Sequence, residues 1–174
     1  VQTMPSEYEF SHEFHSLSQL REDNKEETVG QFSKTHFFEE LPWFLAAYPA
    51  PEAPGKLKID LCCNSADDST MWTVRHATRI IILDQDKEEG SIVRKITQDF
   101  SCVATNQGFT ISITDLLNSS SIVKDGKFTV KVHITLTEVI GLRVGQKCEF
   151  TAPGGSTDNV LLKFHNGSLL VGKQ

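Results

Sequence analysis

The chain has 174 residues and a net charge of −6, with 39% hydrophobic and 23% charged residues. This composition is typical of a soluble globular protein and excludes collagen-like, disordered and disulfide-scaffold classes. The length suffices for one buried core, whereas a second complete domain would be cramped. No apolar run approaches the roughly 20 residues needed to cross a bilayer, so we expect no membrane partner.

The negative charge is concentrated in the first third of the chain. The first 60 residues hold 11 acidic and 5 basic side chains, many of them in the run 21–27, whereas the remainder is balanced. A protein that binds a phosphate backbone needs a basic face, and the composition provides none. We therefore expect no nucleic-acid partner.

Strands dominate the predicted secondary structure, because apolar residues recur with a period of two. The first of these strands covers 9–17, with Phe10, His12 and Phe14 facing inward. The others lie at 31–38, 42–48, 57–63, 73–83 (beginning at Trp72), 91–102, 109–113 and 127–136. One helical turn is expected at 114–118, with Thr114 or Asp115 as its cap.

The clearest strand is 127–136, where five apolar residues alternate with polar ones after an Asp125-Gly126 turn. Seven to eight such strands, with turn signals every 8–12 residues or so, predict an all-β fold: an antiparallel β-sandwich over residues 8–140. Trp43 and Trp72 are expected in its core, where replacing a Trp by Ala costs about 3–5 kcal/mol. We therefore expect Trp43→Ala to unfold the protein.

The composition changes after residue 140. Residues 141–157 contain Gly141, Gly145 and the sequence Ala-Pro-Gly-Gly-Ser-Thr at 152–157, and are interpreted as a linker. Residues 158–174 contain two apolar runs around Asn166-Gly167, which is a strong signal for a β-hairpin. An isolated hairpin is marginal in water, so this one needs a partner surface.

The cysteines do not indicate a disulfide framework. Cys62 and Cys63 are adjacent on a predicted strand and so point to opposite faces, and with Cys102 and Cys148 they form no zinc spacing. Free thiols in a reducing compartment, the cytoplasm or the nucleus, fit best. Residues 1–7 lack the features of a secretory signal, although the absent initiator Met leaves an upstream signal open.

No catalytic motif is found. The six histidines have no metal-binding spacing, and the chain lacks the nucleophile elbow, P-loop and dinucleotide fingerprints. We expect His12 to pack in the core and His133 to be solvated. The chain is therefore predicted to be a binding module with no catalytic residues, no metal and no cofactor.

Several segments, taken in order, resemble a MATH domain, the TRAF-like β-sandwich, of the divergent type found in nematode-style MATH–BTB proteins. They are Phe10–Phe14 with Leu17–Leu20, then Leu41–Leu45, Leu57–Cys63, Trp72–Val74, Asp99-Phe100 with Gly108-Phe109 and Leu116, and finally Ile122–Val130. The hairpin at 158–174 is similar to the first hairpin of a BTB domain. The resemblance implies that the chain stops inside that second domain.

The resemblance also implies a function. MATH–BTB proteins recruit substrate proteins through short Ser/Thr-rich peptides that lie on one sheet of the sandwich. The BTB domain, which forms homodimers, links them to a cullin-3-type ubiquitin ligase. Here the cullin and the dimer contact would depend on the missing BTB region.

Residue by residue, the family's peptide groove maps onto Lys58, Asp60, Cys62, Thr78, Gln98, Gln107, Gly108 and Phe109. Gln107 stands where the family has Trp, Asp60 and Gln98 where it has Tyr, and Thr78 where it has Phe. By alternation Lys58, Asp60 and Cys62 point to the polar face. We expect a more polar groove with a different ligand preference, although recognition through loops stays open.

The sequence is compatible with three alternatives. A MATH-type scaffold or signalling adaptor would lack ubiquitin-ligase coupling. A deubiquitinase would need a catalytic domain downstream, and a secreted lectin-like sandwich would be supported by a Cys102–Cys148 disulfide.

Overall fold

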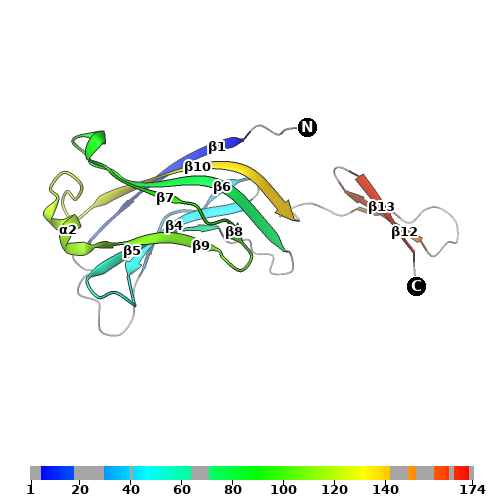
Figure 1. Ribbon diagram of the computed structural model, residues 1–174, viewed down its shortest axis with the longest axis horizontal. Coiled ribbons are helices and arrows are strands. Elements are labelled where there is room, and N and C mark those ends of the chain that lie inside the picture. The colour runs from blue at the N-terminus through cyan, green and yellow to red at the C-terminus, as the bar shows by residue number, and fades with distance from the viewer. Residues whose placement is uncertain are drawn as a thin grey trace.

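The computed structural model describes residues 5–17, 30–39, 41–63 and 71–141, and the backbone of 149–151, 159–164 and 167–172. Two antiparallel sheets pack face to face, as Figure 1 shows. Sheet A has the order β1 (Ser6–Phe14), β10 (Phe128–Gly141), β6 (Trp72–Ile82) and β7 (Ile92–Ile96), with β8 (Phe100–Ser101) also paired to β6. Sheet B has the order β2 (Gln31–Phe32), β4 (Leu41–Pro49), β5 (Lys56–Cys63) and β9 (Asn106–Ser112), with β3 (His36–Phe38) also paired to β4. The predicted β-sandwich is confirmed.

The core lies between the sheets and follows the alternation of the strands. The inward residues of β10 from Phe128 to Leu136 are all buried, and so are Leu57, Ile59, Leu61 and Cys63 on β5. Trp43 is fully buried, with its ring 5.2 Å from that of Phe100, and Trp72 is 4% exposed. The predicted core positions of both tryptophans are therefore confirmed. His12 is half-buried and packs edge-on against Phe14.

Two predicted strands are each divided in the structure. The segment 31–38 forms β2 and β3, because Ser33 leaves the regular ladder: its N–H donates to the Leu45 carbonyl and its hydroxyl accepts from the Leu45 N–H. The segment 91–102 forms β7 and β8. The alternation showed extended backbone in both segments but could not locate the interruptions.

The predicted helical turn is α2 (Ile113–Asn118), and its predicted cap is wrong. The side chain of Ser112 accepts from the N–H of Asp115, so the cap is neither Thr114 nor Asp115. The helix begins one residue earlier than expected because Ile113 and Leu116, three residues apart on one face, are both buried. Ile113 was expected in the preceding strand, β9, which instead covers Asn106–Ser112.

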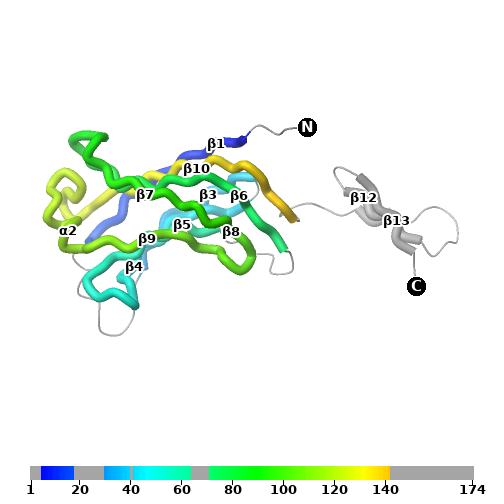
Figure 2. The backbone as a smooth tube through the Cα atoms, in the orientation of Figure 1, coloured from blue at the N-terminus to red at the C-terminus, as the bar shows by residue number. Residues whose placement is uncertain are grey.

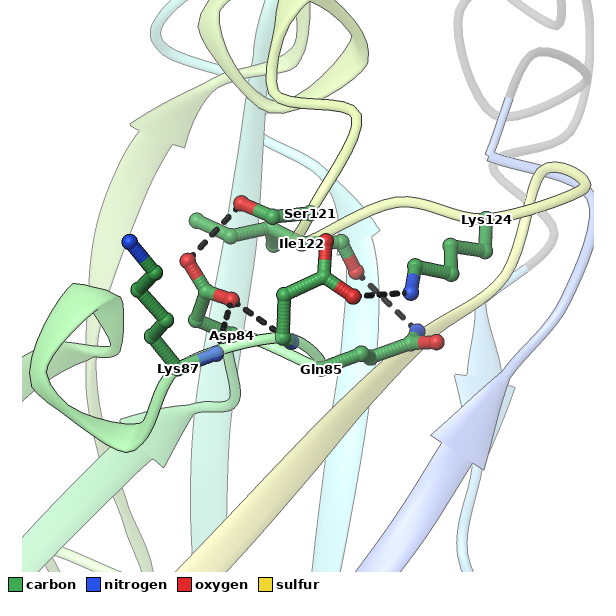
Figure 3. Close-up of polar contacts among 7 residues, drawn as sticks. Asp84, Gln85, Lys87, Ser121, Ile122 and Lys124 are labelled. Carbon is green, nitrogen blue, oxygen red and sulfur yellow. Dashed lines mark hydrogen bonds and ion pairs between the residues drawn. The ribbon is translucent and has the colours of Figure 1, made fainter.

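A polar network ties together two loops at one end of the sandwich (Figure 3). The Asp84 carboxylate accepts from the N–H groups of Asp86 and Lys87 and from the Ser121 hydroxyl, at 2.8, 2.9 and 2.8 Å. Gln85 donates to the Ile122 carbonyl. The network joins the loop before the short 3₁₀-helix η1 (Glu88–Gly90) to the loop that follows α2.

The edges of the two sheets meet at β7 and β9, which run beside each other in Figure 2. The Arg94 guanidinium on β7 lies 5.7 Å from the centre of the Phe109 ring on β9. Among the described residues, β9 is hydrogen-bonded as a ladder only to β5 and so forms an edge of sheet B.

The C-terminal residues form a separate three-stranded sheet of β11 (Glu149–Thr151), β12 (Asn159–Phe164) and β13 (Gly167–Gly172). Strands β12 and β13 pair from Asn159–Gly172 to Phe164–Gly167, over the predicted hairpin. Strand β11 lies within the stretch interpreted as a linker and pairs with β12. Its segment lacks the long alternation by which the other strands were recognised.

Candidate functional site

The outer side of sheet B carries the strongest concentration of predicted site residues. Since Leu57, Ile59, Leu61 and Cys63 are fully buried toward the core, alternation turns Lys58, Asp60 and Cys62 outward. We call this surface the Asp60 face. It is formed by Phe32, Phe44, Tyr48, Lys58, Asp60, Cys62, Asn106, Gly108 and Thr110.

Asp60 lies at the centre of this face and is only 1% exposed. Its Oδ2 accepts from the Tyr48 hydroxyl at 2.5 Å and from the Asn106 side-chain amide at 3.1 Å, and the Lys58 ammonium lies 3.9 Å away. Its Oδ1 has no hydrogen-bond partner among the described residues. A carboxylate removed from water needs such partners, so Asp60 fixes the positions of the Tyr48 and Asn106 side chains.

Small residues flank Asp60 on both neighbouring strands. Ala46 on β4 and Gly108 on β9 are its register partners. A Cβ at Gly108 would lie 2.0 Å from the Ile59 carbonyl oxygen and 2.3 Å from Asp60 Oδ1, so only glycine fits there. The buried carboxylate and the glycine thus depend on each other.

Aromatic side chains form one half of the Asp60 face. Phe32, which is 62% exposed, meets the Phe44 ring edge-on at 6.3 Å, and the Lys58 ammonium lies 5.9 Å from the centre of the Tyr48 ring. Burial and the hydrogen bond to Asp60 raise the pKa of the Tyr48 hydroxyl, so it remains a donor. This half of the face offers exposed ring surface to an apolar ligand group.

Cys62 belongs to the face but is not activated. Burial and the neighbouring Asp60 raise the pKa of its thiol to about 12. The thiol therefore stays protonated, which is the opposite of what a nucleophilic cysteine requires. Cys62, Cys63 and Cys102 are free thiols, and Cys148 lies outside the residues whose side chains are described.

The eight predicted site residues do not share one surface. Lys58, Asp60, Cys62 and Gly108 lie on the Asp60 face. Gln107 and Phe109 point to the other side of β9, where Phe109 packs against the core.

The other two residues belong to the opposite half of the sandwich. Thr78, on β6 of sheet A, is 2% exposed, and its hydroxyl is 2.8 Å from Nδ1 of His76. The same imidazole contacts the Gln98 carbonyl oxygen through Nε2 at 3.0 Å. Burial lowers the pKa of His76.

Sequence reasoning missed Tyr48, Asn106, Phe32 and Phe44. The alternation of 41–49, in which Leu41, Trp43 and Leu45 face inward, was enough to place Phe44 and Tyr48 outward. The expected positions lack aromatic residues, but this face carries aromatic side chains from β2 and β4 instead: Phe32, Phe44 and Tyr48. Asn106 had no such signal, because the predicted strand began three residues after it.

No group of three or more His, Cys, Asp or Glu side chains in the described part of the chain is arranged to hold a metal ion. No helix in it is long and apolar enough to cross a membrane.

The fold and this face define a class: a β-sandwich interaction module with an exposed sheet face and an edge strand. More specifically, the chain belongs to the MATH domain family, whose model matches residues 10–134. It is also similar to BTB and MATH domain-containing protein 38 of Caenorhabditis elegans, with 23% identity over 138 residues, 76% of this chain and 36% of that protein. The chain thus spans about a third of the length of this relative.

Proposed function

We propose that the sandwich binds short extended peptides on the Asp60 face and along the edge of β9. The main support is the edge of β9, which has no second ladder partner among the described residues, beside a face that combines exposed ring surface with the exposed polar side chains of Asn106 and Thr110. Backbone pairing to an edge strand supplies affinity, and the adjacent side chains select the sequence. A peptide with apolar residues and Ser or Thr hydroxyls fits this combination, since rings take the former and polar groups the latter.

A peptide-display selection against the whole chain tests this proposal. Selected peptides are titrated into ¹⁵N-labelled protein, and we expect amide shifts at Asp60, Asn106, Gly108 and Thr110. The double variant Phe32→Ser/Thr110→Arg alters two exposed positions of the face and should weaken binding at least tenfold, since exposed aromatics often dominate peptide affinity.

The matched control is Val103→Ser/Thr114→Arg, which makes the same kinds of change at exposed positions outside the face. It should bind like the wild type. Shifts confined to residues 21–27, or equal losses in both double variants, would place recognition elsewhere.

For the whole protein, the function we propose is that of a substrate-recruiting adaptor for a cullin-3-type ubiquitin ligase in the cytoplasm or nucleus. The support is the family membership together with the name of the relative, which couples MATH to BTB. The homodimer and the cullin contact would be made by a BTB region. Substrate proteins would enter through the Asp60 face.

The test is co-precipitation of the full-length gene product with a cullin, together with ubiquitination of a protein that carries a selected peptide. If peptides bind but no cullin is retained, the protein is a MATH scaffold instead. If the cullin is retained and Phe32→Ser/Thr110→Arg abolishes ubiquitination, the adaptor role is supported.

A further inference from the structure

A concave surface lies on the other sheet, away from the Asp60 face. It is a hollow of about 610 Å³ that crosses all four main strands of sheet A. Its lining includes four register partners whose side chains face the core: Tyr8, Ile134, Thr78 and Ile96. The outward residues of the two adjacent rows form its walls.

One wall carries basic side chains. His133, Arg79 and Lys95 stand directly opposite one another on β10, β6 and β7. Directly paired side chains on neighbouring strands have Cβ atoms about 5 Å apart, and like charges at that distance repel. A sheet selected only for stability would avoid the direct pairing of Arg79 with Lys95.

The other lysines and arginines of the sheet have partners, which makes Arg79 and Lys95 stand out. Lys131 pairs with Glu9 at 2.7 Å and Arg75 with Glu138 at 2.8 Å, and Arg94 lies over the Phe109 ring. His133 shares Glu9 with Lys131, at 2.9 Å. Arg79 and Lys95 are exposed and, among the described residues, have no carboxylate within ion-pair distance.

The opposite wall has room and hydrogen-bond donors for an anion. Ala77 leaves space beside Arg79, and Thr135 and Thr97 offer hydroxyl donors. Glu7, the one carboxylate lining the hollow among the described residues, is on β1, three strands away from Lys95. At about 4.8 Å per strand, that separates the two groups by roughly 14 Å. The hollow is therefore positive at its β6–β7 end.

We propose that this hollow is a second binding site, which takes an acidic side chain of a partner polypeptide between Arg79 and Lys95. The carboxylate relieves the repulsion between the two cations and accepts hydrogen bonds from them and from the threonine hydroxyls. The site is independent of the Asp60 face, because it lies on the outer side of the other sheet.

The test uses hexaglutamate as the probe and hexaglutamine as its neutral match, each titrated into the ¹⁵N-labelled chain at low ionic strength. We expect hexaglutamate alone to shift the amides of Ala77, Arg79, Lys95 and Thr97. The variant Arg79→Gln/Lys95→Gln should bind at least about fivefold more weakly, as expected for the loss of two exposed charge contacts. The variant Lys34→Gln/Lys56→Gln removes the same charge elsewhere and should bind like the wild type.

Two further measurements separate binding from folding and from the first proposal. Because Arg79→Gln/Lys95→Gln removes a repulsion, its melting temperature should equal or exceed that of the wild type. Phe32→Ser/Thr110→Arg should still bind hexaglutamate. Equally weakened hexaglutamate binding in Arg79→Gln/Lys95→Gln and Lys34→Gln/Lys56→Gln would overturn the proposal. It would also be overturned if inorganic phosphate shifted these amides and hexaglutamate did not.

Discussion

Among single residues, Asp60 depends most on its neighbours, because a buried carboxylate must replace its lost water with donors. Tyr48 supplies the shortest of these hydrogen bonds. Tyr48→Phe removes that donor while the charge stays buried, and we expect the free energy of unfolding to fall by about 1–3 kcal/mol. Urea denaturation at pH 7 measures the change.

The control for this prediction is Tyr8→Phe. The Tyr8 hydroxyl also donates to a carboxylate, that of Glu39, but Glu39 is only half-buried and can recover water. Its loss should be clearly smaller. Equal losses in the two variants would show that the burial of Asp60 does not set the cost.

Asp84 makes a separate prediction, about pH. Hydrogen bonds from the Lys87 N–H, the Ser121 hydroxyl and the Asp86 N–H hold the pKa of its carboxyl below the ordinary value. The unfolded chain therefore binds the proton first, and stability is lost as the pH falls from about 4 through the folded-state pKa. Asp84→Asn should be less stable than the wild type at pH 7, and the difference should shrink by pH 2. Denaturation at both pH values checks this, and a constant difference would contradict it.

At the scale of elements, the pairing of β5 with β9 depends on Gly108. A Cβ there would lie 2.0 Å from the Ile59 carbonyl oxygen and 2.7 Å from the Asp60 Cα, and these backbone atoms cannot move without shifting β5. Gly108→Ala should therefore destabilise the fold by about 1–3 kcal/mol, as overpacking does. In ¹⁵N spectra, the amide shifts that differ between Gly108→Ala and the wild type should concentrate in β5 and β9.

Gly30→Ala is the matched glycine control. The nearest atoms to a new Cβ there are side-chain carbons at 3.4 Å, which is ordinary contact. Its stability should stay within about 0.5 kcal/mol of the wild type. An equally small loss of stability in Gly108→Ala would contradict this prediction, because it would mean that β9 can move away from β5 far enough to admit a Cβ.

How far the sequence could predict these elements depended on the range of the interactions. Alternation alone located β5, β6 and the inward face of β10, because it reads which face meets the core. It also put Asp60 outward, but it could not predict that Asp60 is buried there. The covering groups come from Tyr48 and Asn106, which are 12 and 46 residues away. The Ser112 cap was missed for a local reason: buried Ile113 had been counted with the strand.

At the scale of the whole molecule, the described core cluster runs from Phe10 to Leu136 and comes mostly from the two sheets of the sandwich, with further members in α2 and the loops: Leu17, Ile113, Leu116 and Ile122. The segment matching the MATH family, 10–134, covers nearly the same residues. Alternation predicted this core because both sheets alternate along their length. It could not predict the hollow on sheet A, which arises from the register among four strands that are distant in sequence.

Since every strand of the two sandwich sheets lies before residue 142, we expect residues 1–141 to fold without the C-terminal sheet. We expect this fragment to melt cooperatively within about 2 °C of the full chain, because a loss of even 1 kcal/mol shifts a domain of this size by more. A fragment that stops at residue 127 should not fold, since β10 lies between β1 and β6 and supplies five buried side chains. Circular dichroism melts of both fragments, with ¹⁵N spectra of the longer one, make the comparison. A melting point lowered by more than about 8 °C in the longer fragment would mean that the sandwich draws substantial stability from residues after 141.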